Sequence, residues 1–185
     1  MKKLAAIALL VATGSATAQS AGVSETGIRY NELYAGYESL SNSSITMTGY
    51  TIGGSALIDK NIIIDASYAD VAKKTTKSHS TVAGIGYRLG IAPNTDVYAK
   101  IGYISTGGVT SDSSYLLTGG ARGMLTPDLE LTGQLTYSGL KAASFYYGAS
   151  LGYYLTESLT LRGQIRADNA TKSNTTYILS VGYNF

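Results

Sequence analysis

The sequence predicts an all-β chain that closes into a single antiparallel transmembrane β-barrel, with ten strands favoured and eight as the alternative. Three observations predict this fold. Short segments alternate between apolar and polar residues with a period of two, which is typical of strands with one apolar face. Tight turns alternate with longer polar connections, as in membrane barrels with short periplasmic turns and modest outer loops. The composition has 22 Gly and 16 Tyr but no Trp and only 2 Phe, and many tyrosines in short strands suit interfacial aromatic girdles.

The first residues have the pattern of a cleavable export signal. Lys2 and Lys3 precede an apolar run at 4–12 that is too short to span a bilayer, and Ala16-Thr17-Ala18 offers a small-residue cleavage site. A short anchoring helix is the alternative interpretation. We expect cleavage after Ala18 and export to the cell outer membrane, with a signal peptide at 1–18, a disordered polar lead-in at 19–27 and the barrel at 28–185.

Ten alternating segments follow the lead-in, and no segment has a helical period. We predict strands at Ile28–Ser39, Ser44–Ile58, Asn61–Asp70, Ser80–Ile91, Thr95–Ser105, Ser114–Leu125, Asp128–Ser138, Ser144–Leu155, Ser158–Asp168 and Thr175–Phe185.

The connections between these segments are of two kinds. Both prolines stand in tight turns, where a fixed φ and a missing donor do no harm. The tight turns are Asp59-Lys60 with Asn61, Pro93-Asn94, Pro127-Asp128 and Thr156-Glu157. The longer connections, rich in Ser, Thr, Lys and Asn, lie near 40–43, 71–79, 106–113, 139–143 and 169–174.

Two faces separate along each predicted strand. In the ninth segment Leu159, Leu161 and Ile165 point one way, whereas Arg162 and Arg166 point the other. Ionic side chains that face lipid near the midplane would each cost about 2–4 kcal/mol for Arg or Lys, so the charged face is assigned to the lumen. We expect an inward charge network that fills the barrel and leaves no large pore, made of Glu32, Glu38, Asp65, Arg88, Lys100, Arg122, Glu130, Arg162 and Arg166.

Charge and cysteine content exclude several classes of function. The chain has 14 basic and 12 acidic residues, and the excess of +2 disappears when Lys2 and Lys3 leave with the signal. A neutral mature chain gives no argument for a nucleic-acid partner. The absence of cysteine removes thiol chemistry and thiolate metal sites. We therefore expect no cofactor and no metal.

The last residues form an alternating apolar strand that ends on an aromatic side chain. This tail resembles the C-terminal signal that bacterial outer-membrane barrels present to their assembly machinery. The resemblance implies that the barrel assembly machinery and periplasmic chaperones are partners during biogenesis. The residues that carry the proposed assembly signal are Tyr177, Leu179, Val181, Tyr183 and Phe185.

Several further motifs extend this likeness over the whole mature chain. They include Gly53-Gly54-Ser55, Gly86-Tyr87-Arg88, Thr95-Asp96, the run from Leu125 to Leu131, and Tyr153-Tyr154-Leu155-Thr156. Together with the signal and the tail they resemble the small outer-membrane β-barrel proteins of Gram-negative bacteria, often labelled porin-family or opacity-like. The resemblance implies a fold and a location, but that superfamily contains adhesins, serum-resistance proteins and enzymes, so it does not imply an activity.

Three classes of function stay open at the level of sequence. We favour a non-enzymatic structural or envelope role for a monomer surrounded by outer-membrane lipid and lipopolysaccharide. A surface adhesin or lipopolysaccharide-binding barrel is the second class, because Lys73, Lys74, Lys77 and His79 gather in one predicted outer loop. A lipid A-modifying or proteolytic enzyme is the third, in which His79 is the general base beside serine hydroxyls.

Overall fold

The computed structural model describes residues 24–42, 45–108, 111–140, 145–169 and 174–185. The described residues contain no helix that is long and apolar enough to cross a membrane. The strands are β1 (Glu32–Ser41), β2 (Thr46–Leu57), β3 (Ile62–Lys73), β4 (Thr76–Ala92), β5 (Thr95–Gly108), β6 (Asp112–Thr126), β7 (Leu129–Ser138), β8 (Phe145–Tyr154), β9 (Leu159–Asp168) and β10 (Thr175–Asn184).

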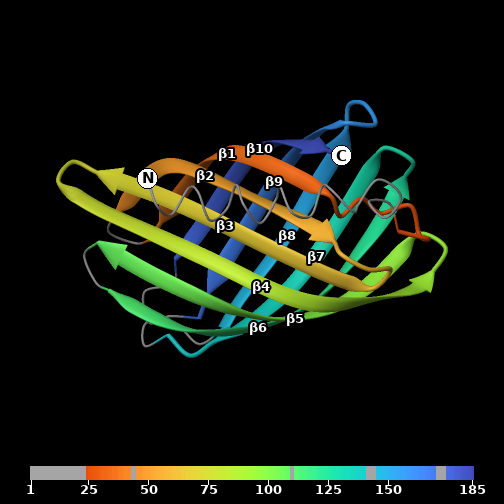
Figure 1. Ribbon diagram of the computed structural model, residues 1–185. Helices are drawn as coiled ribbons and strands as arrows, with labels where there is room; N and C mark the ends of the chain where they lie inside the picture. The colour runs from red at the N-terminus through yellow and green to blue at the C-terminus, as the bar shows by residue number, and fades with distance from the viewer. Residues whose placement is uncertain (1–23, 43–44, 109–110, 141–144, 170–173) are drawn as a thin grey trace.

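Every strand pairs antiparallel with its neighbour in the chain, and β1 pairs with β10, so that the sheet closes into a barrel (Figure 1). The ten-stranded prediction is therefore confirmed. The seam between β1 and β10 runs in continuous register from Glu32 opposite Asn184 to Ser41 opposite Thr175. Closure leaves no unpaired strand edge, which a spanning sheet requires because lipid cannot satisfy backbone donors and acceptors.

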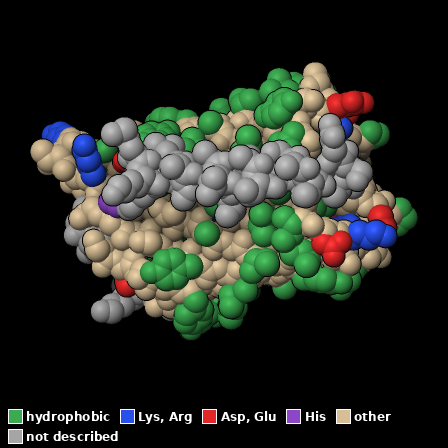
Figure 2. Space-filling view, viewed as in Figure 1, with side chains coloured by type: hydrophobic (Ala, Val, Ile, Leu, Met, Phe, Trp, Pro, Cys, Tyr) green, Lys and Arg blue, Asp and Glu red, His purple; other side chains and the backbone are tan. Residues whose placement is uncertain are grey.

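The two ends of the barrel differ, and we name them by their connections. The tight-turn end carries the short connections from β2 to β3, β4 to β5, β6 to β7 and β8 to β9. The loop end carries the other connections. Hydrophobic side chains occupy the middle of the wall shown in Figure 2, whereas charged side chains gather toward its two ends.

Side-chain alternation sorts the wall as expected for strands. Large apolar residues of β9 and β10, such as Leu161, Ile165 and Leu179, are exposed on the outside, whereas Thr160 and Ser180 are buried. The exposed apolar belt and the buried polar interior reverse the pattern of a soluble barrel. This arrangement fits a wall that faces lipid.

The connection between β3 and β4 differs from the sequence expectation. An outer loop at 71–79 was predicted, but β3 continues to Lys73 and β4 begins at Thr76, so the pair forms a long hairpin. Lys74 takes the turn with φ of 52°. The polar side chains at 71–79 predicted a loop. Beyond the apolar belt, however, the hydrogen bonds between β3 and β4 can continue without apolar side chains. The hairpin projects at the left of Figure 1.

The start of the barrel also differs from the expectation. β1 begins at Glu32 rather than Ile28, and the described part of the predicted lead-in, 24–27, is folded against the tight-turn end. Ile28 and Tyr30 lie in a small apolar core with Leu57, Ile63 and Tyr98. Burial of these two side chains holds the segment out of the strand. The predicted signal at 1–18 and residues 19–23 lie outside the described residues.

Candidate functional site: the ionic lumen and the outer hairpin

Glu130, the second residue of β7, lies at the tight-turn end of the lumen, and its side chain is fully buried. Its carboxylate accepts hydrogen bonds from Arg122 at 2.7 Å, Arg162 at 2.8 Å and the Tyr154 hydroxyl at 2.6 Å. These donors come from β6, β9 and β8. The carboxylate of Glu130 therefore connects β7 to both of its neighbours, β6 and β8, and also to β9. Both guanidiniums are compensated by charge-assisted hydrogen bonds, which are the strong kind.

A second buried carboxylate, Asp96 of β5, also lies at the tight-turn end. It accepts hydrogen bonds from Thr26 at 2.6 Å and Tyr30 at 2.9 Å, and it pairs with Arg88 at 3.1 Å. Arg122 lies over the Tyr30 ring at 4.5 Å from the centroid. Burial raises the pKa of the Tyr30 phenol above its ordinary value, and the nearby Arg122 opposes that shift.

The remaining ion pairs are less enclosed, and the Arg166–Glu38 pair lies toward the loop end. Lys100 and Asp65 meet at 3.0 Å, with about a quarter of each side chain exposed. Arg166 reaches Glu38 at 3.7 Å and is 37% exposed. Arg162 also pairs with Glu32 at 3.2 Å. Each of the inward residues expected from sequence takes part in one of these pairs, and several pairs skip a strand, which the concave inner face allows.

Three members of the network were missed at the level of sequence. Asp96, Tyr30 and Tyr154 were not among the expected lumen residues, although each bonds to a buried charge. A signal for Asp96 was present, because it shares strand parity with Lys100. Tyr30 carried the same signal, because it shares parity with Glu32 in the predicted first strand.

The outer hairpin brings the predicted surface residues together but does not build a catalytic arrangement among the described residues. Asp70 stands directly opposite His79 in the β3–β4 register. Asp70 accepts a hydrogen bond from Tyr68 at 3.3 Å, while the His79 ring stacks on Tyr68 at 6.4 Å between centroids. In the part of the chain that the structure describes, no hydrogen bond joins His79 to a hydroxyl or a carboxylate.

The residues of the proposed assembly signal lie on one face of β10. Tyr177, Leu179, Val181 and Tyr183 are exposed on the outer wall. Phe185 follows the strand and donates its backbone N–H to Asn31 O at 3.2 Å. The Asn31 side-chain oxygen accepts from Leu57 N at 2.9 Å. Asn31 therefore bridges β2 and the residue after β10, the two neighbours of β1.

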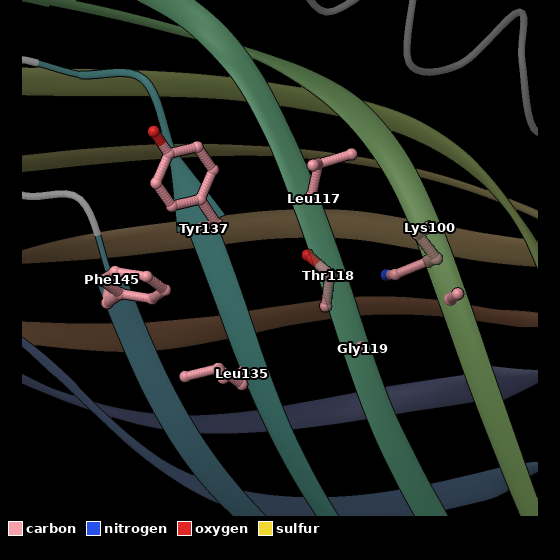
Figure 3. Close-up of a pocket in the computed structure, with 8 residues that line it drawn as sticks. Lys100, Leu117, Thr118, Gly119, Leu135, Tyr137 and Phe145 are labelled. Atoms are coloured by element: carbon pink, nitrogen blue, oxygen red, sulfur yellow. The ribbon is translucent and has the colours of Figure 1, made fainter.

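A shallow hollow of about 330 Å³ lies on the outer wall across β5 to β8. Figure 3 shows Leu117, Leu135, Tyr137 and Phe145 around it, with Gly119 between the flanking side chains. Most of its lining side chains are outward-facing apolar residues, so it belongs to the exposed belt. Among the described residues no group of three or more His, Cys, Asp or Glu could hold a metal ion.

The chain was compared with known protein families and solved structures. The model of the outer membrane protein beta-barrel domain matches residues 5–185. The chain belongs to this family of outer-membrane β-barrels. None of the curated proteins compared with the chain matches it.

Solved structures similar to this outer-membrane barrel include several outer-membrane proteins. The KdgM porin, solved in complex with disordered oligogalacturonate, matches 83% of this chain and 99% of its own at 11% identity, with a TM-score of 0.51. Ail of Yersinia pestis matches 84% and 99% at 14% identity and a TM-score of 0.41. The N-terminal barrel of Pseudomonas aeruginosa OprF matches 84% and 98% at 18% identity and a TM-score of 0.40. At these identities the likeness shows the fold alone.

Proposed function

We propose that this outer-membrane barrel is a non-enzymatic envelope protein with a structural role and a lumen closed to large solutes. The observation that carries the proposal is the buried carboxylate of Glu130 between Arg122 and Arg162. Side chains from β6, β7 and β9 meet there, and a charge network of this kind occupies the space that a pore would need. Barrels with wide aqueous channels have about 16–18 strands.

Planar-bilayer recording of the refolded mature protein tests this function. We expect no large, stable conductance steps, because the ion pairs and the apolar core at the tight-turn end fill the interior. Liposome swelling with a neutral sugar gives an independent readout for uncharged solutes. Steady conductance with rapid sugar uptake would contradict the proposal.

The enzymatic alternative depends on His79 and needs its own test. Cells that express the wild-type protein or His79→Ala are compared for lipid A acylation and for cleavage of surface proteins. We expect both strains to match cells without the protein, because His79 stacks on Tyr68 and Asp70 is bonded to the same tyrosine. A change in lipid A or in a surface protein that requires His79 would establish the enzyme.

A second candidate function is weak binding of an anionic surface ligand at the outer hairpin. Lys73, Lys74 and Lys77 have no ion-pair partner within the described ranges, whereas Arg88, Lys100, Arg122, Arg162 and Arg166 each have at least one. Unpaired cations on an exposed hairpin favour the phosphates of lipopolysaccharide or another polyanion.

Binding of purified lipopolysaccharide to the barrel in detergent measures this second function. Replacement of Lys73 and Lys77 by Gln is expected to weaken binding, and the difference from wild type is expected to shrink at high salt. Lys60→Gln is the matched control, because Lys60 lies on the connection between β2 and β3 at the opposite end. Equal losses for the hairpin variant and the control would place the binding elsewhere.

A further inference from the structure

Residues 24–31 form a segment that is distinct from the barrel wall. Ser24, Thr26, Ile28 and Tyr30 are buried, whereas Glu25 and Gly27 are exposed. The alternation points every second side chain into the tight-turn end, where Ile28 and Tyr30 meet residues of β2, β3 and β5 in the apolar core. The segment therefore fills this end of the barrel from inside.

Local hydrogen bonds give the segment a shape of its own. The backbone N–H of Gly27 donates to Ser24 O at 2.9 Å, and Ser24 N donates to Ile28 O at 2.9 Å. Ile28 N donates in turn to the Ser24 hydroxyl at 3.1 Å. Gly27 has φ of +80°, a value that favours glycine. The segment folds as a compact turn and is not an extension of β1.

Side-chain contacts fasten this turn to the wall at a few points. Asp96 takes hydrogen bonds from Thr26 and Tyr30. Arg122 donates to Arg29 O at 3.0 Å, and Arg29 donates to the carbonyls of the β8–β9 turn at Thr156 and Glu157. Most of these contacts are made by side chains, which can release without breaking the barrel's ladders.

We infer that residues 24–30 are a plug, and that this plug closes the barrel at its tight-turn end. The inference rests on the proposed function, since it assigns the closure of the barrel to a particular segment. Behind the plug the ionic side chains become more accessible toward the loop end, from 11% exposure at Arg122 to 37% at Arg166. We expect the barrel without its plug to form a narrow path for small ions.

The charges along that path predict its selectivity. Acids and bases occur in equal number among the described ion pairs: Glu32, Glu38, Asp65, Asp96 and Glu130 face Arg88, Lys100, Arg122, Arg162 and Arg166. A path lined by balanced charge has little preference for cations or anions. We expect the unplugged barrel to show a reversal potential near zero in a potassium chloride gradient.

Single-channel recording of a barrel that lacks residues 24–30 tests the plug directly. We expect small discrete conductance steps in this deletion variant and none in the wild type. Glu25→Ala is the matched control, because it alters the same segment at an exposed side chain, and it should remain silent. Heat-modifiable migration and a β-type circular dichroism spectrum show that each variant has folded.

A reversible crosslink tests whether the segment must move for ions to pass. The chain has no cysteine, and a Cβ placed on Gly90 would lie 3.0 Å from Thr26 Cγ2. This proximity suits a disulfide in a Thr26→Cys, Gly90→Cys variant. With Tyr30→Ser added to loosen the plug, we expect conductance steps under reduction and their loss on oxidation.

The outcomes separate this inference from the proposed function. A folded deletion variant that stays silent would overturn the plug and leave the closed barrel intact, since the ion pairs alone would then close it. A loosened variant that conducts equally when reduced and oxidised would also overturn the plug. Large, steady conductance by the wild type would instead overturn the proposed function.

Discussion

The two ends of the barrel hold their charges in different ways. At the tight-turn end Asp96 and Glu130 are both fully buried, and each accepts hydrogen bonds from at least three side chains. At the loop end Glu38 is buried, but its single ion-pair partner, Arg166, is more than a third exposed and 3.7 Å away. The same residue types therefore make a dry network at one end and a solvated contact at the other.

This difference decides which charges stabilise the fold. A desolvated carboxylate with several donors cannot be neutralised without leaving buried cations behind, and the cost of breaking such a pair is about 3–5 kcal/mol. A partly exposed pair gains little, because water already solvates both charges and salt screens them. The tight-turn end is therefore expected to carry the stability of the barrel, and the loop end is left free to vary.

The largest effect is expected for Glu130→Gln. The substitution keeps the shape of the side chain but removes the negative charge that Arg122 and Arg162 share. We expect a loss of about 3–5 kcal/mol in the free energy of unfolding. Urea unfolding of the refolded barrel in lipid vesicles measures it. A loss below about 1 kcal/mol, the value for an exposed pair, would remove the distinction between the two ends.

Tyr30→Phe should have the next largest effect. It keeps the buried ring under Arg122 and removes only the hydrogen bond to Asp96, so we expect a loss of about 1.5–3 kcal/mol, as for a hydrogen bond to a charged group. Burial raises the pKa of Tyr30, so the stability that its hydroxyl contributes is fully present below the ordinary tyrosine pKa of about 10. That stability is lost as pH rises through the raised pKa of the folded protein. Wild type and variant should therefore converge in alkaline urea titrations; a constant gap would contradict this origin.

Much of the barrel wall could be predicted from the sequence, because a period of two is a local property. Leu161 and Arg162 are neighbours of opposite character, which indicates that their side chains lie on opposite faces of the strand. In a closed barrel one of these faces contacts lipid and the other lines the lumen. Parity alone predicted that Arg162 faces the lumen, and the structure pairs it with Glu130 at 2.8 Å and with Glu32 at 3.2 Å. Strand length was harder to predict, since the polar ladder near Lys73 has the composition of a loop.

The segment before β1 could not be predicted in the same way. Ser24 and Thr26 are polar residues near a glycine, which is the composition of a disordered lead-in. Their burial depends on Asp96, Arg88 and Arg122, which lie far along the chain. No local pattern encodes such a contact. The sequence prediction therefore placed 24–27 outside the barrel and put Ile28 and Tyr30 in its first strand, whereas these residues pack together at the tight-turn end.

A smaller effect on stability, but a visible one on assembly, is expected for Phe185→Asp. The backbone bond from Phe185 to Asn31 remains possible, so the unfolding free energy should change little. The loss of the terminal aromatic should reduce the fraction of barrel that reaches the outer membrane and increase degradation in the periplasm. Heat-modifiable protein in outer-membrane fractions measures this. Wild-type levels in the variant would exclude Phe185 from the assembly signal.

The smallest effect is expected for Glu38→Gln, which is the matched partner of Glu130→Gln at the loop end. The Arg166–Glu38 contact is long and partly solvated, so we expect a loss of no more than about 1 kcal/mol and a coupling energy of about 0.2–1 kcal/mol in a double-mutant cycle with Arg166→Gln. High salt should reduce this coupling further, because an exposed pair is screened, whereas the Glu130 effect should persist since its partners are enclosed. The two substitutions could instead lower the free energy of unfolding by the same amount, and salt could reduce both losses alike. That result would mean that water reaches Glu130 as readily as Glu38. The tight-turn end would then not be the sealed end of the barrel.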